Sequence, residues 1–134
     1  LCIDARTGQG MLINAGHMHA LHRAPGGVQA IVNSGSPLGL FGETEHTVVT
    51  FQIKPNDMLF LYTDGLIENE GIRGERIKAR ELSQLISEAN APEELRDRVL
   101  VRFQGLLGTQ PLNDDMTFLI IQWEGPSEQV HRTA

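Results

Sequence analysis

The strongest structural signal in the chain is the run Met58-Leu59-Phe60-Leu61-Tyr62-Thr63-Asp64-Gly65. Its first five residues are apolar or aromatic, and turn-forming residues bound it on both sides, Pro55-Asn56-Asp57 before it and Asp64-Gly65 at its end. A continuous apolar run of this length predicts a strand that is buried on both faces. We therefore expect the strand to end by carrying the Asp64 carboxylate out of a dry core.

The composition predicts one compact domain and argues against nucleic-acid binding. The chain has 134 residues, 40% of them hydrophobic, which is enough to build a core without covalent cross-links. Seventeen Asp and Glu outnumber eleven Lys and Arg, and the formal charge of -6 makes a nucleic-acid backbone a poor partner. We expect residues 1–124 to carry the domain and residues 125–134 to be a polar tail.

The cysteine count and the hydropathy predict where the protein works. Cys2 is the single cysteine, so an internal disulfide framework is excluded and a reducing compartment is favoured. No apolar run is long enough to cross a bilayer, and no export signal opens the chain. We therefore expect a cytoplasmic protein with no membrane partner. The first residue is Leu1 rather than methionine, which suggests that the natural chain begins earlier.

Short strand signals separated by turn residues precede the central run. They predict two antiparallel pairs, residues 1–4 with 11–15 and residues 20–23 with 28–31. Residues 33–42 are rich in Gly and Pro and predict an ordered loop, with Leu38, Leu40 and Phe41 packing beneath it.

The segment that leads into the central run has the period of a strand. Val49, Phe51 and Ile53 alternate with polar residues, which predicts a strand with one wet face. Residues 54–57 place Pro55 where a type I turn prefers it. We expect this strand and the central run to form a hairpin.

After Gly65 the hydrophobic period changes from 2 to 3.6, which predicts helices. The first helix has apolar residues at i, i+3, i+4 and i+7, namely Leu82, Leu85, Ile86 and Ala89. The second begins near Pro92, with acids close to the positive end of its dipole, and ends at Gly108. Its apolar stripe is Leu95, Val99, Phe103, Leu106 and Leu107.

A second apolar run, residues 116–121, follows Asp114 and Asp115. Alone, Asp64-Gly65 or Asp114-Asp115 is most simply a turn. Together they indicate a cation site, because Mg²⁺ and Mn²⁺ use oxygen ligands and complete their octahedron with waters. Such a site lowers the pKa of a bound water and clamps a phosphoryl group, so the sequence predicts metal-assisted phosphate hydrolysis.

A rival metal site is a zinc site formed by His17, His19 and His22. On a strand, His17 and His19 would share one face while His22 would point to the other, so loop histidines that bond to the backbone are the better interpretation. For Glu68 and Glu70 a solvated acidic edge is likewise the better interpretation.

Four motifs follow one another along the chain: Asn14-Ala15-Gly16-His17, Pro37-Leu38-Gly39-Leu40, Leu61-Tyr62-Thr63-Asp64-Gly65 and Asp114-Asp115-Met116-Thr117. Their order and approximate spacing resemble those of the SpoIIE-like bacterial serine phosphatases, which belong to the metal-dependent PPM (type 2C) family. Asp4-Ala5-Arg6-Thr7-Gly8 also resembles the family's Asp-x-x-Thr-Gly hairpin. The resemblance extends from Leu1 to about Glu124.

The resemblance implies an α+β fold, an antiparallel β-sandwich with flanking helices (αββα). It also implies two metal ions, Mn²⁺ or Mg²⁺, that activate water to hydrolyse phosphoserine or phosphothreonine. The residues that match metal ligands are Asp64 and Asp114, with the backbone of Gly65 beside them. Asp115 stands where relatives carry Asp or Asn, which implies support of the loop more than ligation. The residues that match scaffold around the site are Asn14, His17, Pro37 and Gly39.

The chain departs from the family pattern at its beginning. Family members carry an earlier portion that supplies strands, two helices and an Asp-x-x-Gly motif whose aspartate bridges both metals. Asp4 lies in the hairpin motif and is not that residue. We therefore expect a domain whose N-terminal portion is missing, which holds at most one metal weakly and is inactive alone.

Two functions remain open from the sequence. The first is a phosphatase domain that dephosphorylates a phosphoserine regulatory protein, such as an anti-anti-sigma factor, behind an upstream receiver or sensor domain, as the resemblance implies. The alternative is a non-catalytic phosphatase-like adaptor that binds a regulatory protein. Missing strands would expose sheet edges, so we also expect a tendency to form homodimers through these edges.

Overall fold

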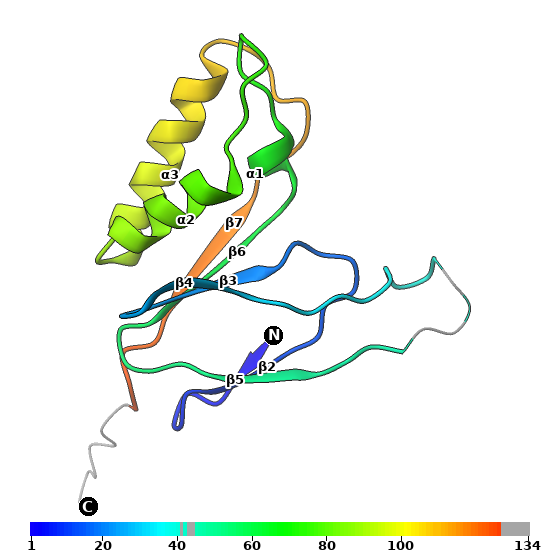
Figure 1. The fold of residues 1–134 in the computed structure, drawn as a ribbon, viewed down its shortest axis with the longest axis vertical. Helices are drawn as coiled ribbons and strands as arrows, with labels where there is room; N and C mark the ends of the chain where they lie inside the picture. Colours follow the sequence, from blue (N-terminus) through cyan, green and yellow to red (C-terminus); the bar gives the residue numbers. More distant parts are fainter. Residues whose placement is uncertain (41, 43–44, 127–134) are drawn as a thin grey trace, which may run out of the picture.

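Antiparallel strands build two sheets in the computed structural model, which describes residues 1–40, 42 and 45–126 (Figure 1). The three-stranded sheet has the order β1-β2-β5, with β1 Cys2–Ile3, β2 Gln9–Leu12 and β5 Val49–Gln52. The four-stranded sheet has the order β4-β3-β6-β7, with β4 Gly27–Ile31, β3 Ala20–Ala24, β6 Met58–Tyr62 and β7 Phe118–Gln122. Both predicted strand pairs, β1 with β2 and β3 with β4, are confirmed.

Strand β6 is buried on both faces, as its apolar run predicted. It pairs with β3 on one side and β7 on the other. Met58 and Phe60 are fully buried against the helices, while Leu59 packs into the core between the sheets. The alternation of side chains along a strand therefore places every residue of this run in one of two cores.

The helices cover one face of the four-stranded sheet (Figure 1). Helices α2 (Ala79–Glu88) and α3 (Pro92–Leu107) confirm the two predicted helices, and the predicted apolar stripe of α3 is its buried face. A third helix, α1 (Gly65–Glu68), was not predicted, because four residues are too few to show a helical period. In the described part of the chain, no helix has the length and hydropathy that crossing a membrane requires.

The second core lies between the two sheets. Its buried residues are Leu12, Ala20, Ile31, Ile53 and Leu59. The expected antiparallel sandwich with flanking helices is therefore present, with the described helices on the four-stranded sheet only. On the three-stranded sheet, Met11 alternates with the buried Gly10 and Leu12 and is 48% exposed.

The expected hairpin between β5 and β6 is wrong. Strand β5 pairs with β2, so the turn at residues 54–57 carries the chain from one sheet to the other. The turn is closed by the Asp57 amide, which donates to the Lys54 carbonyl at 2.9 Å. Asn56 has φ 72°, which belongs to a type II turn rather than the expected type I. Asparagine tolerates this backbone region better than most residues.

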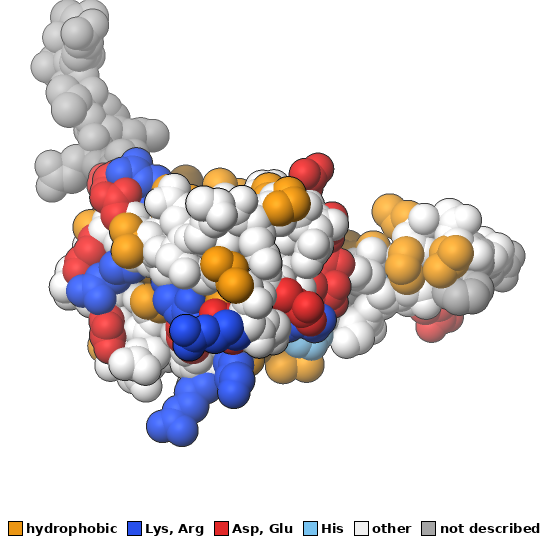
Figure 2. Space-filling view, turned by 90° about the horizontal axis from the view of Figure 1, so that it is seen from above, with side chains coloured by type: hydrophobic (Ala, Val, Ile, Leu, Met, Phe, Trp, Pro, Cys, Tyr) orange, Lys and Arg blue, Asp and Glu red, His pale blue; other side chains and the backbone are white. Residues whose placement is uncertain are grey.

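Two loop expectations also need correction. The segment between β4 and β5 projects from the body, and hydrophobic side chains lie on the projection (Figures 1 and 2). Leu38 and Leu40 are 77% and 65% exposed rather than packed beneath the loop, because a turn from Pro37 to Leu40 lifts them away. Phe41 and residues 127–134 of the predicted tail lie outside the described residues. Strand β2 ends before the expected 11–15 range does, because Asn14 turns to bond the His17 backbone.

Candidate metal centre

The segments that carry the predicted acidic residues lie side by side at one end of the four-stranded sheet, where β6 finishes and β7 begins. Strand β6 runs antiparallel to β7, with Tyr62 opposite Phe118. One step further, the Thr63 amide donates to the Thr117 carbonyl at 3.0 Å, and the Thr117 amide donates to Thr63 Oγ1 at 3.0 Å. Because the end of one antiparallel strand adjoins the start of its neighbour, Asp64 comes beside the segment that carries Asp114 and Asp115.

Asp64 emerges from the core as the N-cap of α1. Tyr62, two residues earlier, is buried, whereas Asp64 is exposed. The Gly65 amide donates to Asp64 Oδ1 at 3.1 Å. An aspartate at this position accepts a hydrogen bond from one of the amides that a helix start leaves free. The bond fixes the position of the Asp64 carboxylate at this end of the sheet.

Gly65 lies directly under the Asp114–Asp115 backbone. A Cβ at Gly65 would approach the Asp115 carbonyl oxygen to 2.3 Å, so only glycine fits there. The Gly65 carbonyl accepts a hydrogen bond from Asn69 Nδ2 at 2.6 Å. This bond uses part of the hydrogen-bonding capacity of the Gly65 backbone, which the resemblance implies as a metal ligand.

Asp114 and Asp115 occupy the exposed loop before β7. Asp114 Oδ1 accepts a hydrogen bond from the Asp115 amide at 2.8 Å. The Asp115 carbonyl lies 3.2 Å from Thr63 Oγ1, which donates to it. Asp64 and Asp114 thus each use one carboxylate oxygen in a local bond with the next amide and keep the other oxygen for a ligand.

Asn69 lies between the Gly65 and Asp114 segments, and the sequence did not single it out as a site residue. Its side chain is fully buried and makes four hydrogen bonds, to the Gly65 and Asp114 carbonyls and from the Asn113 and Asp114 amides. Nothing in its neighbourhood Ile67-Glu68-Asn69-Glu70 marks it, because a polar residue among acids predicts a solvated turn.

The chemistry of the donors fits a hard cation, but their number is small. No described Lys, Arg or His forms an ion pair with Asp64, Asp114 or Asp115. Exposed carboxylate oxygens without a cationic partner are the ligands that Mg²⁺ and Mn²⁺ prefer. Within the described ranges, however, no group of three or more Asp, Glu, His or Cys side chains is arranged to hold a metal. The described residues therefore offer some, and not all, of the ligands that a metal site would need.

The Asn14–His17 motif lies against the same end of the sheet as Asp64. Asn14 clamps the His17 backbone, donating to its carbonyl and accepting from its amide at 2.7 Å each. His17, Thr63 and Asp64 line a small cavity of about 90 Å³ together with Gly16 and Met18. The structure therefore places the Asn14–His17 motif beside Asp64.

The Pro37–Leu40 motif is joined to the first motif through Gly16. Gly16 has φ 83°, and a Cβ there would approach Pro37 Cγ to 2.6 Å. Gly39, in contrast, has φ 79°, and an added Cβ there would have no neighbour within 4 Å among the described residues. Pro37 thus packs beside the Asn14–His17 motif, while Gly39 lies in the projecting turn.

The histidine alternative finds no support in the described residues. His22 Nε2 lies 2.9 Å from Asp57 Oδ2, in a pair that is largely buried. His17 Nδ1 lies 3.1 Å from the Met18 carbonyl, so it donates to the backbone as the loop interpretation predicted. Glu70 pairs with Arg76, and Glu68 is exposed, in agreement with an acidic edge in solvent.

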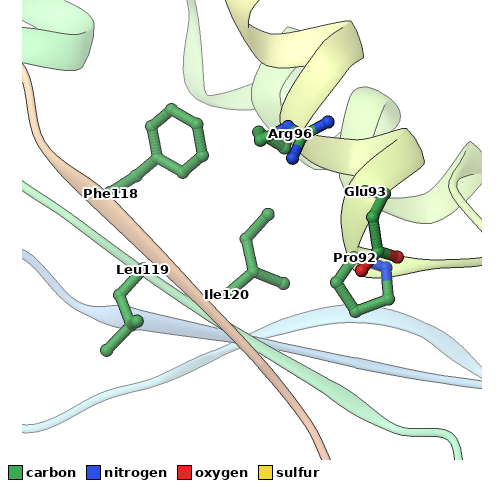
Figure 3. Close-up of a pocket in the computed structure, with 6 residues that line it drawn as sticks. All are labelled: Pro92, Glu93, Arg96, Phe118, Leu119 and Ile120. Carbon is green, nitrogen blue, oxygen red and sulfur yellow. The ribbon is translucent and has the colours of Figure 1, made fainter.

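A separate groove of about 220 Å³ lies between the start of α3 and β7 (Figure 3). It is lined by Pro92, Glu93, Arg96, Phe118, Leu119 and Ile120. Strand β7 pairs only with β6 in the described part of the chain, and Leu119 is 54% exposed. The groove contains none of the predicted site residues and marks an open edge of the sheet.

The sandwich and its helices have the fold of PP2C phosphatase domains. The PP2C phosphatase domain of SpoIIE from Bacillus subtilis, solved with a fragment of its regulatory domain, matches with a TM-score of 0.74 at 22% identity, over 90% of this chain and 35% of that chain. The RsbU and RsbW domains of Rv1364c from Mycobacterium tuberculosis match with a TM-score of 0.70 at 27% identity, over 93% and 35%. The SiaA-PP2C domain of Pseudomonas aeruginosa matches with a TM-score of 0.64 at 20% identity, over 78% and 42%.

The family model of Stage II sporulation protein E (SpoIIE) matches residues 1–124. The chain belongs to this family of phosphatase domains, as its four motifs indicated. It spans well under two thirds of each of the three solved chains. A search of curated proteins found no match.

Proposed function

We propose that this chain is the metal-ligating part of a serine/threonine protein phosphatase domain that depends on Mn²⁺ or Mg²⁺. The observation that carries the proposal is that the Asp64 and Asp114 segments lie side by side at one end of the sheet, each with a carboxylate oxygen left over. Both are exposed, so a phosphoprotein can reach them. We assign residues 1–124 to this domain and residues 125–134 to a tail.

The chain's own residues supply position and charge. Asp64 and Asp114 would hold the cation, and Asp115 would support their loop through its contact with Thr63. When bound, a divalent cation supplies a water of lowered pKa and neutralises charge on a phosphoryl group. Asn14, His17 and Pro37 keep the wall of the adjoining cavity in place, since each is held by a close contact there.

We also propose that the chain is inactive alone, because its described residues do not complete a metal site. The open edge of β7 is where a further strand can pair, and such a strand would pass beside the Asp114 loop. A third carboxylate delivered from such a strand would complete the ligand set. The same open edge favours pairing with a second copy when that strand is absent.

The proposed substrate is a phosphoserine regulatory protein of the anti-anti-sigma type in the cytoplasm, under the control of an upstream receiver or sensor domain. Support comes from the solved relatives, of which one contains RsbU and RsbW domains and another carries a fragment of a regulatory domain. An adaptor without catalysis is the second candidate. It is favoured by the shortage of ligands among the described residues, and it is opposed by Asp64 and Asp114, which form no ion pair with any described residue.

The experiment compares Mn²⁺-dependent hydrolysis of p-nitrophenyl phosphate by this chain and by the longer natural chain. We expect turnover from the longer chain only, and a loss of about 100-fold or more, roughly 3 kcal/mol of transition-state stabilisation, in Asp64→Asn. Asp97→Asn on the exposed face of α3 is the matched control and should keep full activity. A longer chain without turnover would favour the adaptor, and equal turnover by both chains would overturn the claim that this chain is incomplete.

A further inference from the structure

We propose that Asn69 is a positioning residue that sets the distance between the Asp64 and Asp114 segments and thereby the metal affinity of the site. The inference deepens the proposed function and rests on it. It assigns a role in metal binding to a side chain that does not itself contact the metal.

The side chain of Asn69 uses all of its polar atoms to join two segments. Its Nδ2 donates to the Gly65 carbonyl at 2.6 Å and to the Asp114 carbonyl at 2.9 Å. Its Oδ1 accepts from the Asn113 amide at 2.7 Å and from the Asp114 amide at 3.4 Å. Gly65 follows Asp64 directly, so the side-chain amide of Asn69 holds the backbone next to both the Asp64 and the Asp114 carboxylates.

Apart from Asn69, two contacts among the described residues hold the Asp114 segment, and both are made at Asp115: the Thr63 hydroxyl donates to its carbonyl, and Gly65 packs against its backbone. The β6–β7 ladder reaches only as far as Thr63 and Thr117, and Asp114 lies beyond it in an exposed loop. Within the described ranges, Asn69 is the only side chain that bonds the Asp114 backbone. Without Asn69, the Asp114 backbone would lose both of its side-chain bonds, and its carboxylate could shift relative to Asp64.

The burial of Asn69 makes the bridge rigid and selective for asparagine. The side chain is 0% exposed, so water does not compete for its four bonds. An aspartate would set a carboxylate against the two carbonyl oxygens, and a leucine would leave all four backbone groups unpaired. Only a side chain with two donors and an acceptor at this length satisfies both segments.

The test measures Mn²⁺ binding to the longer natural chain by the loss of the free-ion signal in electron paramagnetic resonance. The matched control is Asn33, which is also buried and whose Nδ2 donates to the Leu12 and Thr47 carbonyls at 3.0 and 2.9 Å. We expect Asn69→Ala to raise the Kd for Mn²⁺ by about 10-fold or more, as the loss of a supporting residue does at other metal sites. Asn33→Ala should lower the Tm comparably and leave the Kd unchanged.

The kinetic readout separates positioning from general stability. In Asn69→Ala the Mn²⁺ concentration for half-maximal hydrolysis of p-nitrophenyl phosphate should rise while kcat at saturating Mn²⁺ largely recovers. Asn69→Ser, which keeps one hydroxyl, serves if the alanine variant does not fold, and should show a smaller rise in the same direction. Equal Mn²⁺ affinity in the Asn69 and Asn33 variants would overturn the inference. A wild-type chain that neither binds Mn²⁺ nor hydrolyses the ester would overturn the proposed function itself.

Discussion

Gly65 lies so close to Asp115 that a methyl group on its Cα would come within 2.3 Å of the Asp115 carbonyl oxygen. The contact joins the residue after Asp64 to the loop that carries Asp114. It explains why a glycine, which has no side chain, follows Asp64 at the buried first position of helix α1. The close approach of the two backbones depends on the absence of this side chain.

We predict that Gly65→Ala destabilises the chain by about 3 kcal/mol, because the obstacle is backbone and cannot rotate away. Urea unfolding followed by circular dichroism measures the change. Gly105→Ala in α3 is the control: an added Cβ there meets nothing within 4 Å, and helix propensity should raise stability by about 0.5–1 kcal/mol. A Gly65→Ala variant as stable as the wild type would contradict the observed approach.

A second prediction concerns the contact between Gly16 and Pro37. Gly16→Ala combines a positive φ with a clash against Pro37, whereas Gly39→Ala has the positive φ alone. We expect the Gly39 variant to cost about 1 kcal/mol and the Gly16 variant at least about 1 kcal/mol more. Adding Pro37→Ala should recover part of that excess, and a double-mutant cycle with no coupling would show that the two motifs are independent.

The pair of His22 and Asp57 provides a third prediction. Asp57 is 3% exposed and accepts hydrogen bonds from His22 Nε2 at 2.9 Å and from the Lys54 amide at 2.8 Å. His22→Ala leaves this buried carboxylate without its side-chain partner and should cost about 3 kcal/mol. A cycle with Asp57→Asn should give a coupling of about 1–3 kcal/mol at neutral pH. A coupling near zero would mean that the pair does not stabilise the link between β3 and the turn before β6.

A fourth prediction concerns Glu94, at the start of α3, and how the stability of the protein changes at acid pH. The Asn90 amide and the Arg98 guanidinium donate to its carboxylate and hold its pKa below the usual value of 4.5. Because the folded-state pKa is lowered, the contribution to stability is complete above about pH 4.5 and is lost as the pH falls through the lowered value. Glu94→Gln should therefore lower the Tm at pH 7 and approach the wild-type Tm in acid.

The control for this titration is Glu93→Gln in the same helical turn, since Glu93 has no hydrogen bond to another side chain in the described part of the chain. Its Tm at pH 7 should stay close to that of the wild type, because its carboxylate has no such hydrogen bonds to lose. A Glu94 variant whose Tm difference from the wild type stays constant from pH 7 to pH 3 would exclude the carboxylate as the titrating group.

Local patterns predicted most elements of this protein. The apolar run at Met58–Tyr62, the 3.6-residue period of α2 and α3 and the turns within the β1–β2 and β3–β4 pairs all arise between residues close in sequence. Errors fell where tertiary geometry overrides such patterns. The strand at Val49–Gln52 has the period of a hairpin partner for β6, yet it pairs with β2 because the intervening turn crosses between sheets.

By itself the sequence determined the two long helices, the approximate place of the strands and which strand ends carry carboxylates, because hydrophobic period and turn residues act over a few positions. Only the tertiary structure decided that β6 and β7 are neighbours, that Gly65 lies under Asp115, and that Asn69 bonds Asp114, 45 residues away. Such contacts depend on how the sheet is assembled. No local pattern encodes them, since a buried amide and a solvated one look alike in sequence.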